Sequence, residues 1–342
     1  MIRQVIELLR RTQHGLSRVG LTGLMAVAAV TAAHACEQPP PAVKNLDLSR
    51  YYSDRDGTII DPESLDRHRD AVGPLTAFLR HVTADADKSV RRTAPKAQAE
   101  AAACAVEWLA AWASEDAWLG DVTSKQAEYQ RKWDLAGVAL TYLKVRSFAK
   151  AEQRTVIEPW LERFADRARS FFDDPSRKRN NHWYWLGLGL AATALATDSP
   201  RHWAEARGIM TDASADIRAD GALQAELDRK SRALQYHTFS LMPLIAMAEL
   251  AHSKGEDWYA LGDGALHRLA ALCMRGLADP DVFDRLAKAR QDRPIRPGAG
   301  WLQLYASRFK DRIPAGMPDI APGHRWLGGD VLVLADVLKF KK

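Results

Sequence analysis

Hydrophobic residues recur with a period close to 3.6 along almost the whole chain after residue 60, and alternating β-branched stretches are nearly absent. This period predicts amphipathic helices rather than strands. Helices separated by short polar turns are expected over residues 61–86, 94–117, 123–147, 150–173, 181–197, 200–217, 223–253, 257–277, 281–290 and 327–338.

Local signals support several of these boundaries. Proline follows Asp61, Ser199 and Asp279, at what would be the first helical position. Residues 123–126 have the form of a capping box. Successive helical hairpins without a sequence repeat are typical of a bundle, a solenoid or an α/α toroid. No Pro/Gly/Ser-rich linker divides residues 36–342, so we expect one all-α domain there.

Residues 1–35 are expected to form a signal peptide outside this domain. Four arginines precede residues 19–36, which contain no Lys, Arg, Asp or Glu, and Ala33-His34-Ala35 matches a small-x-small cleavage signal. A membrane-spanning anchor is the alternative, but the segment is rich in Ala, Gly and Thr and therefore weakly hydrophobic. The prediction is a periplasmic protein with no stable membrane anchor.

The formal net charge of +5 suggests an anionic partner. Residues 1–35 contain four Arg and one Glu, however, which leaves 44 basic against 42 acidic residues in the rest of the chain. The surplus therefore lies mostly in the leader. We expect no nucleic acid partner, and an anionic ligand would have to be bound by a few local cations.

Cysteines tend to pair in an oxidising compartment. Cys36 and Cys104 are candidates for one disulfide, which would join the Pro-rich start to a helix. Cys273 lies in an apolar run and is expected to be a buried free thiol. The other pairings remain open.

The densest polar and aromatic cluster covers residues 179–185, at the start of an apolar helix. Asn180 alone is explained as a helix N-cap. That explanation does not cover Asn181, His182 and the aromatic residues that follow. A helix start also offers free N–H groups and a positive dipole end, which suit a carboxylate ligand.

A second cluster covers residues 226–237. Arg229 and Tyr236 are seven residues apart, so on a helix they would share one face, with Arg232 between them. Each residue also has a structural explanation: Arg229 in a surface ion pair, Tyr236 in the core and His237 as a hydrogen-bonded buried histidine.

Several common chemistries have no matching motif in the sequence. The chain has no H-E-x-x-H, no paired histidines at metal-ligand spacing, no G-x-S-x-G, no P-loop and no glycine fingerprint. A hydrolase that uses two carboxylates remains open, since Asp and Glu are plentiful.

The two clusters carry a resemblance to a known family. Asn180-Asn181-His182-x-Tyr184-Trp185, followed by Asp220-Gly221 and Glu226-Leu227-x-Arg229-x-x-Arg232-Ala233-Leu234-x-Tyr236-His237, resembles the mannuronate-specific alginate lyases of polysaccharide lyase family five. Tyr51-Tyr52-Ser53-Asp54, Lys132-Trp133-Asp134, Tyr142-Leu143-Lys144 and Gly328-Gly329-Asp330 match as well.

The resemblance implies an α/α toroid, an exported enzyme without a required metal or other cofactor, and alginate as substrate. By this resemblance Asn181, His182 and Arg229 would neutralise the substrate carboxylate, and Tyr236 would transfer protons. Substrate-binding residues are expected at Gln126, Trp133, Trp183, Tyr184, His237, Arg232 and Tyr52. For Gln126 the capping box is the competing explanation.

These residue types suit β-elimination at a 4-linked uronate. The hydrogen on C5 is barely acidic beside an ionised carboxylate, and donors on that carboxylate stabilise an enolate-like transition state. A tyrosine near cations is expected to have its phenolate favoured, and it can then accept the C5 proton and afterwards donate to O4. The alternative, His182 as base and Tyr236 only as acid, stays open.

The resemblance implies that the segment from about residue 51 to residue 69 is a lid over the cleft. It contains no lysine, and its cations are Arg55, Arg67 and Arg69. Two further hypotheses remain: a lyase or hydrolase acting on another acidic glycan, and a non-catalytic polyuronate-binding component of an alginate export machinery.

Overall fold

Helices that bury only one hydrophobic face alternate with helices that are buried on nearly every side. The computed structural model describes residues 36–54 and 59–339. Its α-helices are α1 (Pro62–Ala71), α2 (Gly73–Arg91), α3 (Pro95–Ser114), α4 (Lys125–Val145), α5 (Ala151–Ser170), α6 (Asn181–Thr197), α7 (Pro200–Asp216), α8 (Gln224–Leu227), α9 (Ala233–Ser253), α10 (Leu261–Ala278), α11 (Asp281–Ala287), α12 (Trp301–Ala306) and α13 (Val331–Lys339). Two short strands, β1 (Gly323–His324) and β2 (Gly329–Asp330), pair antiparallel.

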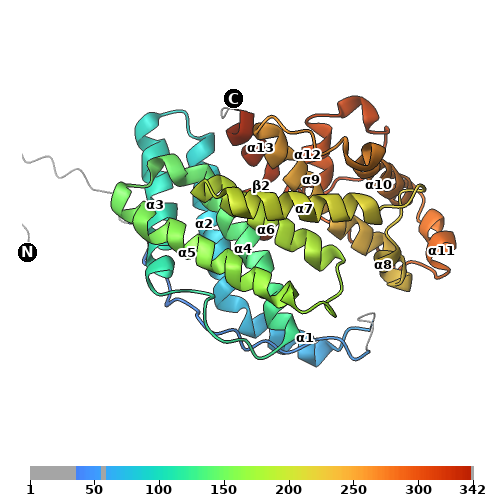
Figure 1. Ribbon diagram of the computed structural model, residues 1–342, viewed down its shortest axis with the longest axis horizontal. Helices are drawn as coiled ribbons and strands as arrows, with labels where there is room; N and C mark the ends of the chain where they lie inside the picture. The colour runs from blue at the N-terminus through green and yellow to red at the C-terminus, as the bar shows by residue number, and fades with distance from the viewer. Residues whose placement is uncertain (1–35, 55–58, 340–342) are drawn as a thin grey trace, which may run out of the picture. The chain divides into compact units, whose positions relative to one another are not determined.

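The long helices form an inner and an outer layer. Helices α2, α4, α6 and α9 contact one another in that order, and α13 packs against α9, α2 and α4, which closes the inner ring. Helices α3, α5, α7 and α10 cover the inner ones, and in Figure 1 α5 and α7 lie toward the viewer over α4 and α6. Residues Cys36–Lys342 form one compact unit. This architecture is the α/α toroid that the family resemblance implied.

Sequence composition explains which helices lie inside. Helix α6 is apolar on all sides, which is typical of a fully buried helix, and most of its residues are buried. Gly189 lets α6 approach α4 closely, because a Cβ at this position would lie only 2.8 Å from Leu135 Cδ2. The polar side chains on α4 are also buried, which packing alone does not require.

Two of the expected helices are broken in the structure. The helix expected over 61–86 splits at Val72 because Pro74 has no N–H to donate to the preceding turn. The helix expected over 223–253 becomes α8, a 3₁₀ turn over Lys230–Arg232 and then α9, with Lys230 in the left-handed region at φ 52°. The short α12 and the β1–β2 pair were not predicted.

The start of the described chain is fastened to α3. Cys36 and Cys104 form a disulfide, and the indole N–H of Trp108 and of Trp112 donates to the Glu37 and Pro40 carbonyls respectively. Cys273 is a buried free cysteine, as expected. Among the described helices none is long and apolar enough to cross a membrane. The predicted signal peptide lies outside the described residues.

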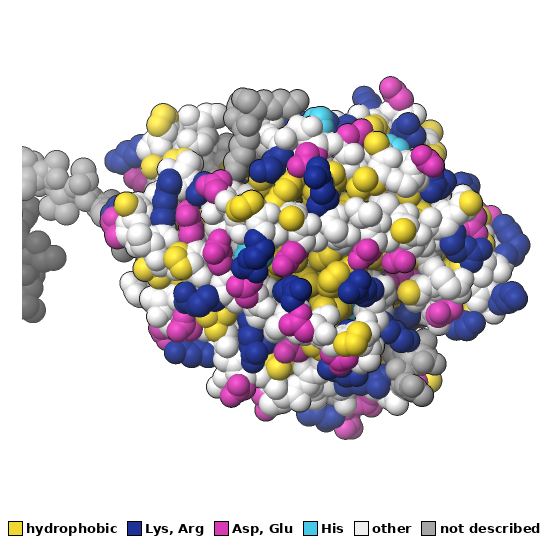
Figure 2. Space-filling view, in the orientation of Figure 1, with side chains coloured by type: hydrophobic (Ala, Val, Ile, Leu, Met, Phe, Trp, Pro, Cys, Tyr) yellow, Lys and Arg dark blue, Asp and Glu magenta, His cyan; other side chains and the backbone are white. Residues whose placement is uncertain are grey.

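Basic and acidic side chains are interspersed on the face shown in Figure 2, with hydrophobic side chains between them. Many of the cations are committed to short-range ion pairs, such as Arg201 with Asp166 and Arg163 with Asp116. Such pairs leave little net electrostatic field across this face.

Candidate active site

One face of α4 forms an aromatic wall. Gln126, Tyr129 and Trp133 follow one another at helical spacing and share this face. The capping-box explanation of Gln126 is wrong, because the N-cap is Ser124, whose hydroxyl accepts from the N–H of Ala127. The Gln126 side chain is buried and does not cap the helix, so it is available for a role in the site.

The start of α6 supplies Asn181 and His182. Asn180 is the N-cap, as expected, and its side chain accepts from the His182 N–H. Glu226 Oε1 accepts from both the backbone N–H and the side-chain amide of Asn181, at 3.0 and 2.9 Å. The His182 ring stacks on Tyr129 with ring centroids 3.7 Å apart, and it lies 5.8 Å from the Trp133 ring.

The segment between α8 and α9 brings Arg229, Arg232 and Tyr236 together. The Arg229 guanidinium lies over the Tyr236 ring at 4.0 Å, and that of Arg232 lies 5.1 Å from the same ring. Helical spacing was the wrong reason for this contact, because Arg229 precedes α9 and the left-handed Lys230 turns the chain between them. Tyr52 completes the group: its hydroxyl lies 3.1 Å from that of Tyr236 and accepts from Arg232 Nη1 at 3.0 Å.

Burial and nearby cations determine the protonation of the site. Burial, followed by the charges of Lys132 and Arg229, holds the pKa of His182 well below its usual value, so the imidazole is neutral. Burial also raises the pKa of Tyr236, and the neighbouring Arg229 and Arg232 do not offset it. The expectation that the Tyr236 phenolate is favoured is therefore wrong for the protein without substrate.

Tyr52 shows the opposite shift. Burial raises its pKa, but the Arg232 charge and the hydrogen bonds from Tyr236 and Arg232 outweigh burial, and the net shift is downward. The two hydroxyls of the Tyr52–Tyr236 pair thus differ in acidity, with Tyr52 the better place for a negative charge.

Buried polar atoms without a hydrogen-bond partner gather at this site. Within the described residues they include Gln126 Nε2, Lys132 Nζ, Trp133 Nε1, Asn181 Oδ1 and His182 Nδ1. An unpartnered buried donor or acceptor costs free energy, and such atoms cluster where a ligand satisfies them. The cluster contains both donors and acceptors, so it can bind a ligand rich in hydroxyl groups.

The aromatic wall is supported from behind. Trp133 stacks on Trp326 with centroids 4.5 Å apart, and the Trp326 indole donates to the fully buried Asp134. Burial raises the pKa of Asp134 to about 6. Lys144 holds the turn after Trp326 by donating to the Gly328 carbonyl at 2.7 Å. Several spaced motifs of the sequence therefore meet at one place.

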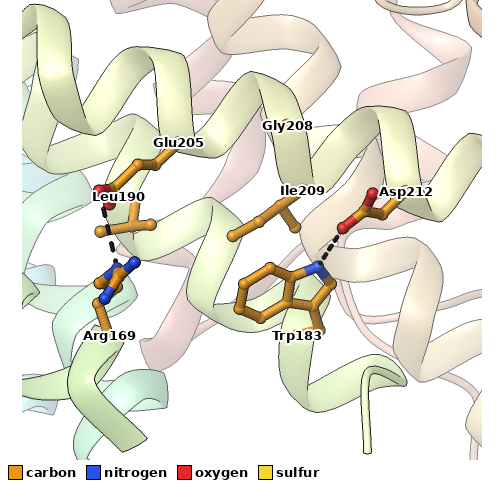
Figure 3. Close-up of a pocket in the computed structure, with 7 residues that line it drawn as sticks. All are labelled: Arg169, Trp183, Leu190, Glu205, Gly208, Ile209 and Asp212. Atoms are coloured by element: carbon orange, nitrogen blue, oxygen red, sulfur yellow. Dashed lines mark hydrogen bonds and ion pairs between the residues drawn. The ribbon is translucent and has the colours of Figure 1, made fainter. Parts of the chain in front are cut away.

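Trp183 does not join this site. It lines a cavity of about 210 Å³ between α5, α6 and α7, on the outer side of the inner ring, where its indole N–H donates to Asp212 (Figure 3). The Arg179 guanidinium lies over its ring at 4.6 Å. Tyr184 is also directed elsewhere, since it is buried and its hydroxyl donates to Asp216. The prediction that these two residues bind substrate is therefore wrong.

His237 is a structural histidine, as its alternative explanation proposed. It is fully buried; its Nε2 accepts from the Leu223 N–H at 3.0 Å, and its Nδ1 lies 2.8 Å from the Ala233 carbonyl. It fastens the start of α8 to α9 and has no free nitrogen for a sugar. The prediction that it binds substrate is wrong.

His237 makes folding depend on pH. Burial lowers its pKa from 6.5 to about 4, so below pH 6.5 the unfolded chain takes up a proton that the native chain excludes. The contribution of the neutral His237 to the free energy of unfolding is complete above pH 6.5 and is lost as the pH falls toward 4. Between pH 7 and pH 4 we expect the free energy of unfolding to fall by about 3 kcal/mol more in the wild type than in His237→Gln. Urea unfolding of both proteins across this range measures the difference, and parallel curves would contradict the assignment.

The predicted lid is only partly a loop. Tyr52 pairs with Ile60 in an isolated bridge, and residues from Pro62 onward form α1. Arg55 lies outside the described residues. Arg67 and Arg69 are exposed and pair with Glu63 and Asp66 of the same helix. Among the described residues of this segment, Tyr52 contacts Tyr236 and Arg232 of the site.

Sequence reasoning missed three contributors to the site. Tyr129 lies one turn from Gln126 and could have been found from the spacing on α4. Trp326 had no comparable signal, because it approaches from a distant segment. Glu226 belongs to the second cluster and to the family motif, but its contact with Asn181 on a distant segment could not be predicted. Among the described residues no group of His, Cys, Asp or Glu could hold a metal ion.

Comparisons with known proteins place the chain among related proteins. A family model described as Alginate lyase matches residues 46–283. A protein named polysaccharide lyase from Stenotrophomonas maltophilia is 39% identical, over 90% of this chain and 93% of its own. An alginate lyase from Pseudomonas fluorescens is 30% identical, over 79% of this chain and 75% of its own.

Solved structures share the fold. The crystal structure of alginate lyase A1-III from Sphingomonas species A1 superposes with a TM-score of 0.73 at 24% identity, over 87% of this chain and 85% of that one. A variant of alginate lyase A1-III complexed with a tetrasaccharide gives 0.76 at 23% identity, over 89% and 88%.

The toroid fold and these matches define a polysaccharide lyase. More specifically, the chain belongs to the alginate lyase family. The family resemblance and the α/α toroid, both predicted from the sequence, are confirmed.

The α4 wall leads to a paired prediction. Trp133→Ala is expected to raise KM for the polymer about tenfold, since it removes a stacking surface inside the site. Trp183→Ala removes an indole on the outer side of the ring and is expected to leave KM and kcat unchanged within about twofold. Steady-state kinetics of both variants check this, and equal effects would contradict the placement of Trp183 outside the site.

Proposed function

We propose that this protein is a mannuronate-specific alginate lyase, which cleaves 4-linked β-D-mannuronate by β-elimination and leaves a C4–C5 unsaturated uronate at the new non-reducing end. The observation that carries the proposal is the contact between Arg229 and Tyr236, with the guanidinium 4.0 Å above the ring. It places a carboxylate-binding cation beside a hydroxyl that can transfer a proton.

In this proposal the substrate carboxylate is neutralised by side chains. Arg229 supplies the charge, and Asn181 and the neutral His182 supply hydrogen bonds from the start of α6. Together they stabilise the enolate-like transition state after the C5 proton is removed. Trp133 and Gln126 on α4 would line the sugar subsites, and their unpartnered N–H groups suit sugar hydroxyls.

Tyr236 is the proposed proton-transfer residue. Its raised pKa means that the phenol has to lose its proton before it can act as the base. Tyr52 Oη is 3.1 Å away, is held by Arg232 and has a lowered pKa, so its hydroxyl is the better hydrogen-bond donor of the pair and would stabilise the Tyr236 phenolate after that proton has passed to solvent. In β-mannuronate H5 and O4 lie on one face of the ring, so Tyr236 can serve O4 as the acid after it has accepted the C5 proton.

The activity is tested with three polymers. Purified protein is incubated with polymannuronate, polyguluronate and hyaluronan, and ultraviolet absorbance of the C4–C5 double bond is followed. We expect a signal on polymannuronate and little on the others. Cleavage without the chromophore would mean hydrolysis, and binding without cleavage would mean a non-catalytic role; either contradicts the proposal.

We further propose that the protein acts in the periplasm after cleavage before Cys36, where it would lie beside the alginate export machinery. The basic leader, the uncharged stretch and the Ala33-His34-Ala35 signal support this proposal. Cell fractionation and N-terminal sequencing of the exported protein test it. Recovery in the cytoplasm with residues 1–35 attached would contradict it.

A further inference from the structure

The site contains a carboxylate that an anion-binding cleft does not obviously need. Glu226 lies on the short helix α8, three residues before Arg229, and is 1% exposed. Burying a carboxylate is costly unless it is paired or hydrogen-bonded. A negative charge here also opposes the binding of a polyuronate, so a compensating role is expected.

The contacts of Glu226 join the two segments that carry the carboxylate-binding groups. Its Oε1 accepts from the backbone and side-chain N–H groups of Asn181, at 3.0 and 2.9 Å, and so ties the first turn of α6 to α8. Helix α8 is in turn held on α9, because the Leu223 N–H donates to His237. Glu226 thus links Asn181 at the start of α6 to the segment that carries Arg229.

Glu226 also selects the orientation of the Asn181 amide. A carboxylate only accepts hydrogen bonds, so it attracts the amide nitrogen and repels the amide oxygen. A flipped Asn181 would place its carbonyl oxygen against Glu226 Oε1. The unflipped amide keeps its second N–H and its carbonyl oxygen available, and Asn181 Oδ1 is buried without a partner.

This contact changes the interpretation of the α6 terminus. The sequence suggested that free N–H groups at the helix start hold the substrate carboxylate. Glu226 already occupies the Asn181 N–H, and the Asn180 side chain already accepts from that of His182. The substrate carboxylate is therefore left to side chains, whose directions have to be fixed by other means.

We infer that Glu226 is a positioning residue for the elimination: it fixes the Asn181 amide and holds the start of α6 in register with Arg229. This inference rests on the proposed function, because it assigns Glu226 a part in binding a uronate carboxylate. In this inference Glu226 acts through Asn181, to which both of its hydrogen bonds from α6 belong.

A double-mutant cycle tests the inference. Glu226→Gln keeps the shape of the side chain but removes the charge that orients the amide, and it is expected to lower kcat on polymannuronate about tenfold with a smaller change in KM. In an Asn181→Ala background the same substitution is expected to cost less than about twofold, because the amide that it orients is absent and the glutamine oxygen can still accept from the backbone N–H of residue 181. Glu226→Ala removes both hydrogen bonds and is expected to lower kcat in both backgrounds, because the start of α6 is then no longer held to α8.

A matched control separates positioning from stability. Glu249 is another buried carboxylate; it accepts from Tyr259 and Arg308 at the far end of α9. Glu249→Gln is expected to lower the unfolding midpoint and leave kcat unchanged. Thermal unfolding of every variant identifies loss of fold, and Glu226→Gln keeps the cycle measurable if Glu226→Ala does not fold.

The outcomes are distinct. Equal losses from Glu226→Gln in the wild-type and Asn181→Ala backgrounds would overturn the inference, as would a wild-type kcat in Glu226→Gln. A wild-type protein that produces no unsaturated uronate from polymannuronate would instead overturn the proposed function. A loss confined to the wild-type background supports the inference.

Discussion

Tyr236→Phe is expected to lower kcat on polymannuronate about a thousandfold, since it removes the hydroxyl that transfers the proton. The ring, its contact with Arg229 at 4.0 Å and the hydrogen bond from Arg232 to Tyr52 all remain possible without that hydroxyl. Binding of an oligomannuronate is therefore expected to change less than about threefold. Product absorbance measures kcat, and calorimetry with the oligosaccharide measures binding.

Another buried tyrosine provides the control. The hydroxyl of Tyr142 on α4 donates to Glu158 at 3.0 Å, away from the aromatic wall. Tyr142→Phe also removes one buried hydroxyl and is expected to keep its kcat. A near-native kcat in Tyr236→Phe would show that the assigned mechanism is wrong. Loss of binding in parallel with kcat would show that Tyr236 shapes the cleft rather than transferring a proton.

Arg229→Ala is expected to damage both kinetic parameters. A guanidinium on the uronate carboxylate acts in the bound substrate and more strongly in the enolate-like transition state. We expect KM to rise about tenfold and kcat to fall about a hundredfold or more.

Arg179 provides a geometrically matched control for Arg229. Its guanidinium lies over an indole ring at 4.6 Å, in an arrangement like that of Arg229 over Tyr236, but outside the inner ring. Arg179→Ala is expected to leave kcat/KM within about twofold of the wild type. An unchanged kcat in Arg229→Ala would mean that the guanidinium contributes only to ground-state binding. Compared with Arg229→Ala, Arg229→Lys is expected to restore KM partly and kcat only slightly. An ammonium group lacks the planar guanidinium geometry that binds a carboxylate through two hydrogen bonds.

The pairing of Arg229 with Tyr236 shows how a correct site can follow from an incorrect local structure. The sequence predicted their contact from a seven-residue helical spacing. In the structure a left-handed residue, Lys230, separates them, and Arg229 folds back onto the ring. Periodicity alone did not detect this turn because the apolar residues on either side of it, Leu227 and Leu234, are seven residues apart, which also fits an uninterrupted helix.

The protonation states of the site residues could not be predicted from the sequence. Proximity of arginines to Tyr236 suggested a favoured phenolate, but its pKa is raised because burial is the larger effect. Burial depends on every segment packed around a residue, including Tyr52 from a distant part of the chain. The same reason explains His237, whose nitrogens are both used inside the core.

The sequence by itself determined the helical class and most helix positions, since both follow from local periodicity and local capping. It also determined the family, through Asn181, His182, Arg229 and Tyr236 in a fixed order. The tertiary structure alone decided that Trp183 and Tyr184 face away from the site, that Trp326 supports Trp133 and that Glu226 holds Asn181. These facts depend on contacts between residues far apart in the chain, and no local pattern of hydrophobic and polar positions encodes such contacts.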